Sequence, residues 1–119
     1  MPESAEELVS RLRGTFNAGV TRDLDWRRSQ LAALAAMLRE NEEEILAALA
    51  ADLGKPRFEA WAGDVASSAS EADYIRKHLG RWAKDSRARI PMPLMPGSAA
   101  IRYEPRGVVL VMSRPSNRT

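Results

Sequence analysis

Apolar positions recur at helical spacing through most of the chain and define three long runs. In the first run, Leu8, Leu12 and Phe16 lie four residues apart and share one face of a helix. Ser4 precedes this run, and Glu7 follows three residues later, which is the arrangement of a capping box. We therefore predict a first helix that begins directly after Ser4.

Breaks between the runs coincide with residues that favour helix ends. Gly19 follows the first run and Gly54 the second, and glycine readily takes the left-handed conformation that ends a helix. Pro56 then prevents the second run from continuing. Within the second run the apolar pattern lapses at Asn41, and Glu44 three residues later repeats the N-cap signature. We predict a kink or a fresh helix there.

The second and third runs carry the longest apolar faces. The second begins after Asp23 or Asp25, and its apolar positions are Trp26, Leu31, Leu34, Leu38, Ile45, Leu46, Leu49 and Leu53. The third alternates spacings of three and four residues over about seven helical turns. We name it the Phe58–Trp82 stripe, made of Phe58, Trp61, Val65, Ser68, Ala72, Ile75, Leu79 and Trp82. Its small central residues, Ser68 and Ala72, favour close packing within a globular fold over a coiled coil.

The pattern becomes extended towards the end of the chain. Three prolines between residues 87 and 97 exclude a helix there and favour an extended segment. A strand is predicted over 99–104, a turn over 104–107, and a second strand over 108–112, whose five apolar residues are typical of burial on both faces. The predicted fold class is mainly α, with N-terminal helices followed by a β-hairpin.

The organisation expected along the chain has three parts. We predict an N-terminal helical segment with a proline-rich extended end over 1–97, the β-hairpin over 98–112, and an atypical tail over 113–119. The length of 119 residues suits one domain.

Composition and charge narrow the classes of function. The chain is 45% hydrophobic and 29% charged, and its net charge of +2 is too small to indicate a nucleic-acid partner. Residues 1–60 carry 8 basic and 11 acidic side chains, whereas residues 61–119 carry 10 and 5. Such asymmetry is more typical of a salt-bridged surface inside a larger protein than of a nucleic-acid groove.

The residues themselves predict no catalytic, cofactor-binding or metal site. The chain has no cysteine. Its only histidine, His78, has no second metal ligand at a spacing typical of metal sites. The acidic run Glu40–Glu44 falls at a predicted helix start, where negative charge complements the helix dipole. Cations are likewise favoured at the C-terminal end of a helix. A basic cluster lies at this end of the third run: Arg76, Lys77, Arg81, Lys84, Arg87 and Arg89.

Targeting signals are not evident in the sequence. The opening MPESAEEL is acidic and has no apolar core of a signal peptide. No stretch approaches the roughly 20 apolar residues that a membrane span needs. We expect a cytoplasmic protein.

Several stretches, taken in order, resemble one enzyme family. They include TFNAGVTRDLDWRRSQLAALAAMLRENEEEILAALAADLGKP, FEAW, EADYIRKHLGRWA and, above all, IRYEPRGVVLVM. From about Thr15 to Met112 the chain is similar to the N-terminal segment of the class 3-type NAD(P)-dependent aldehyde dehydrogenases. The most specific part is the combination of ALAADLGK with YEPRGVVLV.

The resemblance implies an architecture and a reaction. The family fold has a Rossmann-like cofactor domain, a catalytic α/β domain and a small β arm for oligomerisation. The N-terminal helices would pack on the cofactor domain, and residues 101–112 would contribute to the arm and lead into that domain. The implied reaction oxidises an aldehyde to a carboxylic acid with NAD or NADP, through a cysteine thiolate and a glutamate-assisted thioester hydrolysis.

The chain departs from the family pattern after Met112. The family strand runs on into a motif with Trp-Asn, whose asparagine helps to hold the developing oxyanion, but here the sequence is SRPSNRT. Asn117 falls one place late beside the wrong neighbours, so that role is not carried over. The implied catalytic cysteine is absent. We expect a segment that is truncated or frameshifted after Met112, inactive alone and without a bound cofactor.

A hypothesis from another class stays open. The Phe58–Trp82 stripe can serve a non-enzymatic helical interaction or oligomerisation module by docking a partner helix. Both hypotheses allow self-association through the hairpin or the stripe, and neither predicts a nucleic-acid partner or a membrane span.

Overall fold

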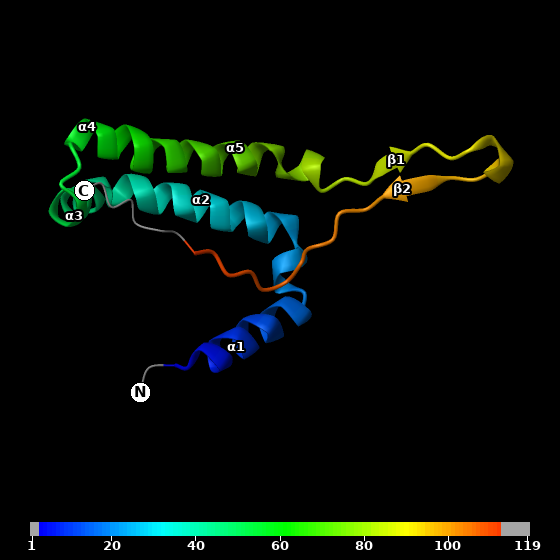
Figure 1. The fold of residues 1–119 in the computed structure, drawn as a ribbon, viewed down its shortest axis with the longest axis horizontal. Coiled ribbons are helices and arrows are strands. Elements are labelled where there is room, and N and C mark those ends of the chain that lie inside the picture. The colour runs from blue at the N-terminus through cyan, green and yellow to red at the C-terminus, as the bar shows by residue number, and fades with distance from the viewer. Residues whose placement is uncertain (1–2, 113–119) are drawn as a thin grey trace.

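The computed structural model describes residues 3–112, and helices occupy most of this range (Figure 1). The five α-helices are α1 (Ala5–Asn17), α2 (Leu24–Glu40), α3 (Glu42–Leu53), α4 (Arg57–Ala60) and α5 (Ser67–Trp82). A π-helical segment, Trp61–Ala66, joins α4 to α5, and single 3-10 turns occupy Val20–Arg22 and Met92–Leu94. The strands are β1 (Ser86–Ala88) and β2 (Ala99–Ile101). The predicted mainly α fold with a hairpin is confirmed.

The helix ends follow the local signals in the sequence. The Ser4 hydroxyl accepts a hydrogen bond from the Glu7 amide at 3.2 Å, and the Glu7 carboxylate accepts one from the Ser4 amide at 2.9 Å. This is the predicted capping box. Asp23 caps α2 by accepting from the amides two and three residues further on, at 3.1 and 3.3 Å. Gly19 and Gly54 take the left-handed conformation, with φ of 82° and 61°.

The boundary at Asn41 is also confirmed, but its cause differs from the prediction. The Asn41 side-chain amide donates to the carbonyl oxygen of Met37 at 2.8 Å, in the last turn of α2. It makes no N-cap hydrogen bond to α3. Asn41 therefore closes the preceding helix instead of capping the following one.

The third run forms one continuous helical rod from Arg57 to Trp82, as the stripe predicts. It lies antiparallel to α2 in Figure 1, and the two helices make the main packing of the molecule. Val65, Ala69 and Ala72 are buried along it, whereas Ser68, predicted to lie at the crossing, is exposed. The wider turn of the π-helical segment spaces the buried Ala60 and Val65 five residues apart and shifts the helical phase, so that Ala69 is buried in place of Ser68.

The core is thin and consists mostly of alanine. Within residues 3–112 the buried hydrophobic residues are Ala35, Leu46, Ala60, Val65, Ala69 and Ala72. Leu46, Ala60 and Val65 form one cluster, which the partly buried Leu38, Ile45 and Leu49 surround. Alanine lets helix axes approach closely but buries little apolar area. The packing is therefore close, and each large buried side chain contributes a large share of the stability.

The hairpin lies elsewhere than predicted. β1 and β2 pair antiparallel, with Ser86 opposite Ile101 and Ala88 opposite Ala99. The prediction that 99–104 pairs with 108–112 is wrong, because Val108–Met112 forms no strand, and the predicted start of the hairpin at residue 98 is corrected to residue 86. The three prolines fall in the loop, where no ladder hydrogen bond is needed, and this frees residues 86–88 to pair.

Residues 102–112 return from the hairpin towards α1 (Figure 1). Arg22 forms a salt bridge with Glu104 at 3.5 Å. A side-chain carbon built at Gly107 would lie 3.7 Å from the Phe16 ring, so the backbone of this segment runs close to α1. Gly107 has φ of 102°, a conformation that favours glycine. The predicted atypical tail, 113–119, lies outside the described residues.

Candidate functional site

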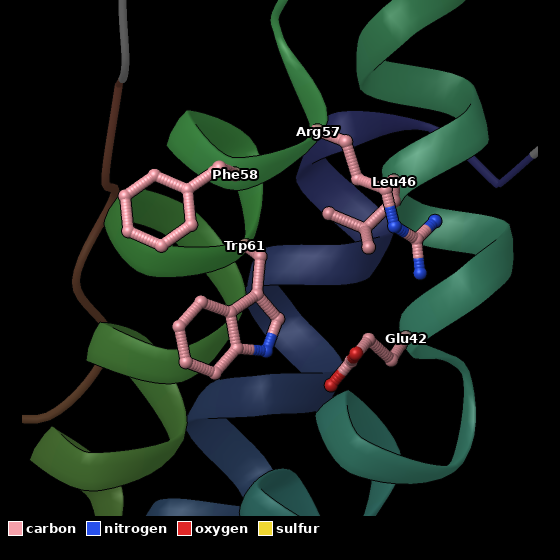
Figure 2. Close-up of a pocket in the computed structure, with 5 residues that line it drawn as sticks. All are labelled: Glu42, Leu46, Arg57, Phe58 and Trp61. Atoms are coloured by element: carbon pink, nitrogen blue, oxygen red, sulfur yellow. The ribbon is translucent and has the colours of Figure 1, made fainter.

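A hollow beside the core lies between α3 and the start of the third run. Its volume is about 440 Å³, and it is lined by Glu42, Leu46, Arg57, Phe58 and Trp61. Figure 2 shows the two aromatic side chains on one side and the α3 residues on the other, with Arg57 reaching across. We call this site the α3–α4 hollow.

A tight connection creates the hollow. Gly54 ends α3 in the left-handed conformation, and Pro56 directly precedes α4. The chain therefore turns back at once, and α4 lies against α3. Lys55 in the connection donates a hydrogen bond to Asp64 of the π-helical segment at 2.5 Å. The turn is thus tied to the rod that follows it.

A bidentate ion pair bridges the hollow's edge. The Arg57 guanidinium donates two hydrogen bonds to the Glu43 carboxylate, at 2.8 and 2.5 Å. These hydrogen bonds, and then the Arg57 charge, lower the pKa of Glu43 below its usual value. The pKa of Arg57 is raised by the same hydrogen bonds and by the charges of Glu43 and Glu42. Glu43 therefore binds the guanidinium directly, and Glu42 acts on it only through its charge.

This charge arrangement decides what the hollow can hold. An anion such as a dinucleotide phosphate needs free hydrogen-bond donors or a helix N-terminus. Arg57 is already bound to Glu43, and Glu42 on the rim repels negative charge. The residues present do not fit NAD or NADP. They offer an apolar wall, because the ring centroids of Phe58 and Trp61 lie 6.1 Å apart and Phe58 is 76% exposed. At the edge of this wall, the charge of Arg57 is neutralised by Glu43.

Replacing Glu43 by Gln is expected to loosen the connection between α3 and α4 in a pH-dependent way. The pKa of Glu43 is lowered in the folded chain, so its contribution is present above the usual glutamate pKa, 4.5, and is lost as the pH falls through the lowered value. Urea unfolding midpoints of the parent chain and Glu43→Gln should therefore differ near neutral pH and converge in acid. Glu44→Gln, on the same helix turn, is the control and should leave the midpoint unchanged. Equal effects of both substitutions at all pH values would contradict this expectation.

The residues singled out in the sequence do not converge on one site. Glu42, Glu43 and Glu44 lie in the first turn of α3, where the helix dipole favours them, as predicted. Glu40, the first residue of the predicted acidic run, instead ends α2, where the dipole does not favour negative charge. In the basic cluster, Arg76 forms a salt bridge with Asp73 at 3.2 Å on the surface of α5. His78 packs against the rings of Tyr74 and Trp82 on the same helix, with ring centroids 4.2 and 5.6 Å away, far along the rod from the hollow.

The described part of the chain was also predicted to hold no metal site and no membrane span. Residues 3–112 contain no group of three or more histidine or carboxylate side chains that could hold a metal ion. None of the helices in this range combines the length and the apolar character needed to cross a bilayer.

The Arg57–Glu43 pair was not predicted from the sequence. The acidic run Glu40–Glu44 was predicted to complement a helix dipole, and Arg57 was assigned no partner. Opposite charges on both sides of a Gly-Lys-Pro turn are a usable signal, because such a turn brings its flanking helices together.

Apolar surface is the other conspicuous feature of residues 3–112. Val109, Leu110, Val111 and Met112 are 68–85% exposed. Leu8, Val9 and Leu12 on α1 are also exposed on one helical face. A contiguous apolar segment of this kind marks a surface that contacts something else.

Comparison with known proteins gives one consistent result. The model of the aldehyde dehydrogenase family matches residues 2–114. Aldehyde dehydrogenase family 3 member B1 of Rattus norvegicus is 38% identical over 110 residues, which are 92% of this chain and 24% of that protein. Family 3 member H1 of Arabidopsis thaliana is 40% identical over 109 residues, or 92% of this chain and 22% of that protein.

The fold agrees with the sequence. A solved structure described as the substrate-bound state of Staphylococcus aureus AldH superposes with a TM-score of 0.82 at 31% identity, covering 88% of this chain and 23% of that one. The chain thus spans about a quarter of the length of the relatives it matches. The resemblance to the class 3 type is confirmed, and the chain belongs to the aldehyde dehydrogenase family.

Proposed function

We propose that the chain is the N-terminal segment of a class 3-type aldehyde dehydrogenase, an enzyme that oxidises an aldehyde to a carboxylic acid with NAD or NADP. The observation that carries the proposal is the TM-score of 0.82 over 88% of the chain, together with the family match over residues 2–114. In this function the helices and the hairpin form a scaffold that is completed by the rest of the enzyme.

The exposed surfaces support a scaffold role. Val108–Met112 is entirely apolar, yet within the described residues it has no strand partner. A strand of this composition suits the interior of a sheet, where both faces are covered. We propose that it enters the cofactor domain of the whole enzyme, as the family resemblance implies. The apolar face of α1 is a second surface suited to such a contact.

Catalysis by the 119 residues alone is not expected. The family reaction requires a cysteine thiolate, and the sequence contains no cysteine. The purified chain, given an aldehyde with NAD or NADP, should form reduced cofactor no faster than a protein-free control. Turnover clearly above that control would refute this part of the proposal.

A segment exchange tests the scaffold role directly. Residues 3–112 would replace the matching segment of the Arabidopsis thaliana family 3 member H1, which is 40% identical. The chimera should retain aldehyde-dependent NAD(P)H formation, whereas the plant enzyme lacking the segment should have none. A chimera carrying Val65→Asp is the negative control, because its inserted helices should not fold and it should be as inactive as the deletion. A folded chimera as inactive as the deletion would contradict the proposal.

A second candidate function is a helical interaction or oligomerisation module built on the Phe58–Trp82 stripe. Three exposed aromatic side chains favour this function: Phe58, Trp61 and Trp82. However, Val65 and Ala72 are buried, so only the ends of the stripe are accessible. Sedimentation analysis separates the two functions. A defined oligomer that Trp61→Glu dissociates would favour the module.

The cellular location and the bound cofactor are properties of the whole enzyme and not of this segment alone. A cytoplasmic location stays a prediction from the sequence. NAD or NADP would bind the whole enzyme, and the described residues contribute no phosphate-binding group to it in the α3–α4 hollow.

A further inference from the structure

The α3–α4 hollow combines two exposed aromatic rings with one carboxylate. Phe58 and Trp61 are 76% and 40% exposed, and their ring planes are inclined at 36° to each other. The two rings are therefore not stacked, and they do not cover each other's faces. Figure 2 shows Glu42 extending from α3 toward this aromatic pair from the opposite side of the hollow.

The charged side chains around the hollow carry one excess negative charge. Arg57 contributes one positive charge, whereas Glu42 and Glu43 contribute two negative charges. The Arg57 guanidinium is occupied by its two hydrogen bonds to Glu43, at 2.8 and 2.5 Å. Glu42 acts on Arg57 only through its charge. The excess charge is therefore that of Glu42, and its sign favours a cation in the hollow.

The hydrogen-bonding groups of the hollow indicate which kind of cation fits. A primary ammonium has three N–H donors, and each needs an acceptor once the group leaves water. The side chains of Leu46, Phe58 and Trp61 provide no such acceptor, which leaves the Glu42 carboxylate alone. A quaternary ammonium has no N–H group, and it is attracted to aromatic faces within about 6 Å of the ring centroid. The hollow therefore suits a quaternary ammonium better than a primary amine.

We propose that the α3–α4 hollow binds a small quaternary ammonium compound. The methyl groups of this cation lie on the faces of Phe58 and Trp61, and the Glu42 carboxylate offsets its charge. The hollow has a volume of about 440 Å³, which is within the range of small-molecule sites, about 300–1,000 Å³. The inference goes beyond the proposed enzymatic role and does not depend on it.

A second copy of the chain is the competing occupant. An aliphatic side chain from another copy would also cover Phe58 and Trp61. It would, however, shield the Glu42 carboxylate from water without supplying an opposite charge, and such desolvation is unfavourable. Charge complementarity therefore favours the cation.

Choline and its neutral isostere, neohexyl alcohol, test the inference with the full 119-residue chain. The two probes share one shape and differ in charge, because carbon replaces the quaternary nitrogen in the alcohol. Binding is followed through the indole N–H signal of Trp61 in NMR spectra at constant ionic strength, and Trp61→Leu identifies that signal by removing it. Choline should bind with a dissociation constant of about 1 mM, as two cation–π contacts and one exposed ion pair predict. The alcohol should bind about tenfold more weakly or not at all.

Matched substitutions locate the bound cation. Phe58→Leu should weaken choline binding about tenfold, and Glu42→Gln should weaken it about threefold. Trp82→Leu removes an exposed tryptophan at the other end of the rod, and Glu44→Gln removes a carboxylate from the same turn of α3. Both of these controls should leave the dissociation constant unchanged. Circular dichroism establishes that the variants keep their helices.

Several results would overturn the proposal. They are an unchanged Trp61 signal in the presence of choline, equal binding of choline and the alcohol, and equal loss of binding in Phe58→Leu and Trp82→Leu. Sedimentation velocity provides a further test. If Phe58→Leu dissociated a defined oligomer while choline left the Trp61 signal unchanged, the hollow would hold a second copy of the chain instead.

Discussion

Val65→Asp is expected to unfold the helical part of the chain. Val65 is 1% exposed and packs with Leu46 and Ala60 in the central cluster. A carboxylate there would be buried without a partner. Burial of an unpaired charge is among the most destabilising core substitutions and lowers the free energy of unfolding by more than about 4 kcal/mol. The core is otherwise mostly alanine, so little remaining burial can offset this loss. Far-UV circular dichroism should show most of the helical signal gone near neutral pH.

The same change at an exposed valine is the control. Val20 lies in the 3-10 turn after α1 and is 45% exposed. Val20→Asp adds the same charge and the same polar group, and it should leave the helical signal and the urea midpoint almost unchanged. If both variants unfolded equally, the central cluster would not be the source of stability.

The second large effect concerns self-association. Val109 and Val111 lie in the exposed apolar segment. We propose that the chain self-associates through this segment, and replacing both valines by Lys should then make it predominantly monomeric. Short apolar segments of high β-propensity and low charge pair readily with other copies, and two lysines prevent this by repulsion. Sedimentation velocity over a range of concentrations measures the change.

A charge-matched variant separates this effect from general solubility. Val9 on α1 and Val20 are also exposed valines, at 37% and 45%. Val9→Lys with Val20→Lys adds the same two charges away from the segment, and it should reduce association much less. If both double variants reduced self-association equally, net charge and not residues 108–112 would be its cause.

Local sequence determines the helices of this chain. The capping residues Ser4 and Asp23 and the terminating Gly19 and Gly54 all act through hydrogen bonds or backbone conformations within a few residues. Such signals are present in the sequence itself, which is why the boundaries could be predicted. Asn41 shows the limit, because its side chain can bind either neighbouring helix and the sequence does not choose between them.

Strand pairing and the α3–α4 hollow depend on contacts between distant residues. Val108–Met112 has stronger strand character than Ser86–Ala88, yet the latter pairs with β2. Pairing requires a partner edge at the right place, which composition does not encode. In the same way, Glu43 and Arg57 lie 14 residues apart, and only the turn at Gly54 brings them within hydrogen-bond distance.

The close approach of Gly107 to Phe16 has a consequence for cooperativity. Residues 102–112 are held near α1 by this approach and by the Arg22–Glu104 salt bridge, while α1 itself contacts the 3-10 turn and not the α2–α5 layer. The two segments therefore form a subglobal opening unit with little buried area, which can detach while α2 and α5 stay paired. Amide hydrogen exchange should therefore be faster in the first and last described segments than in α2 and α5.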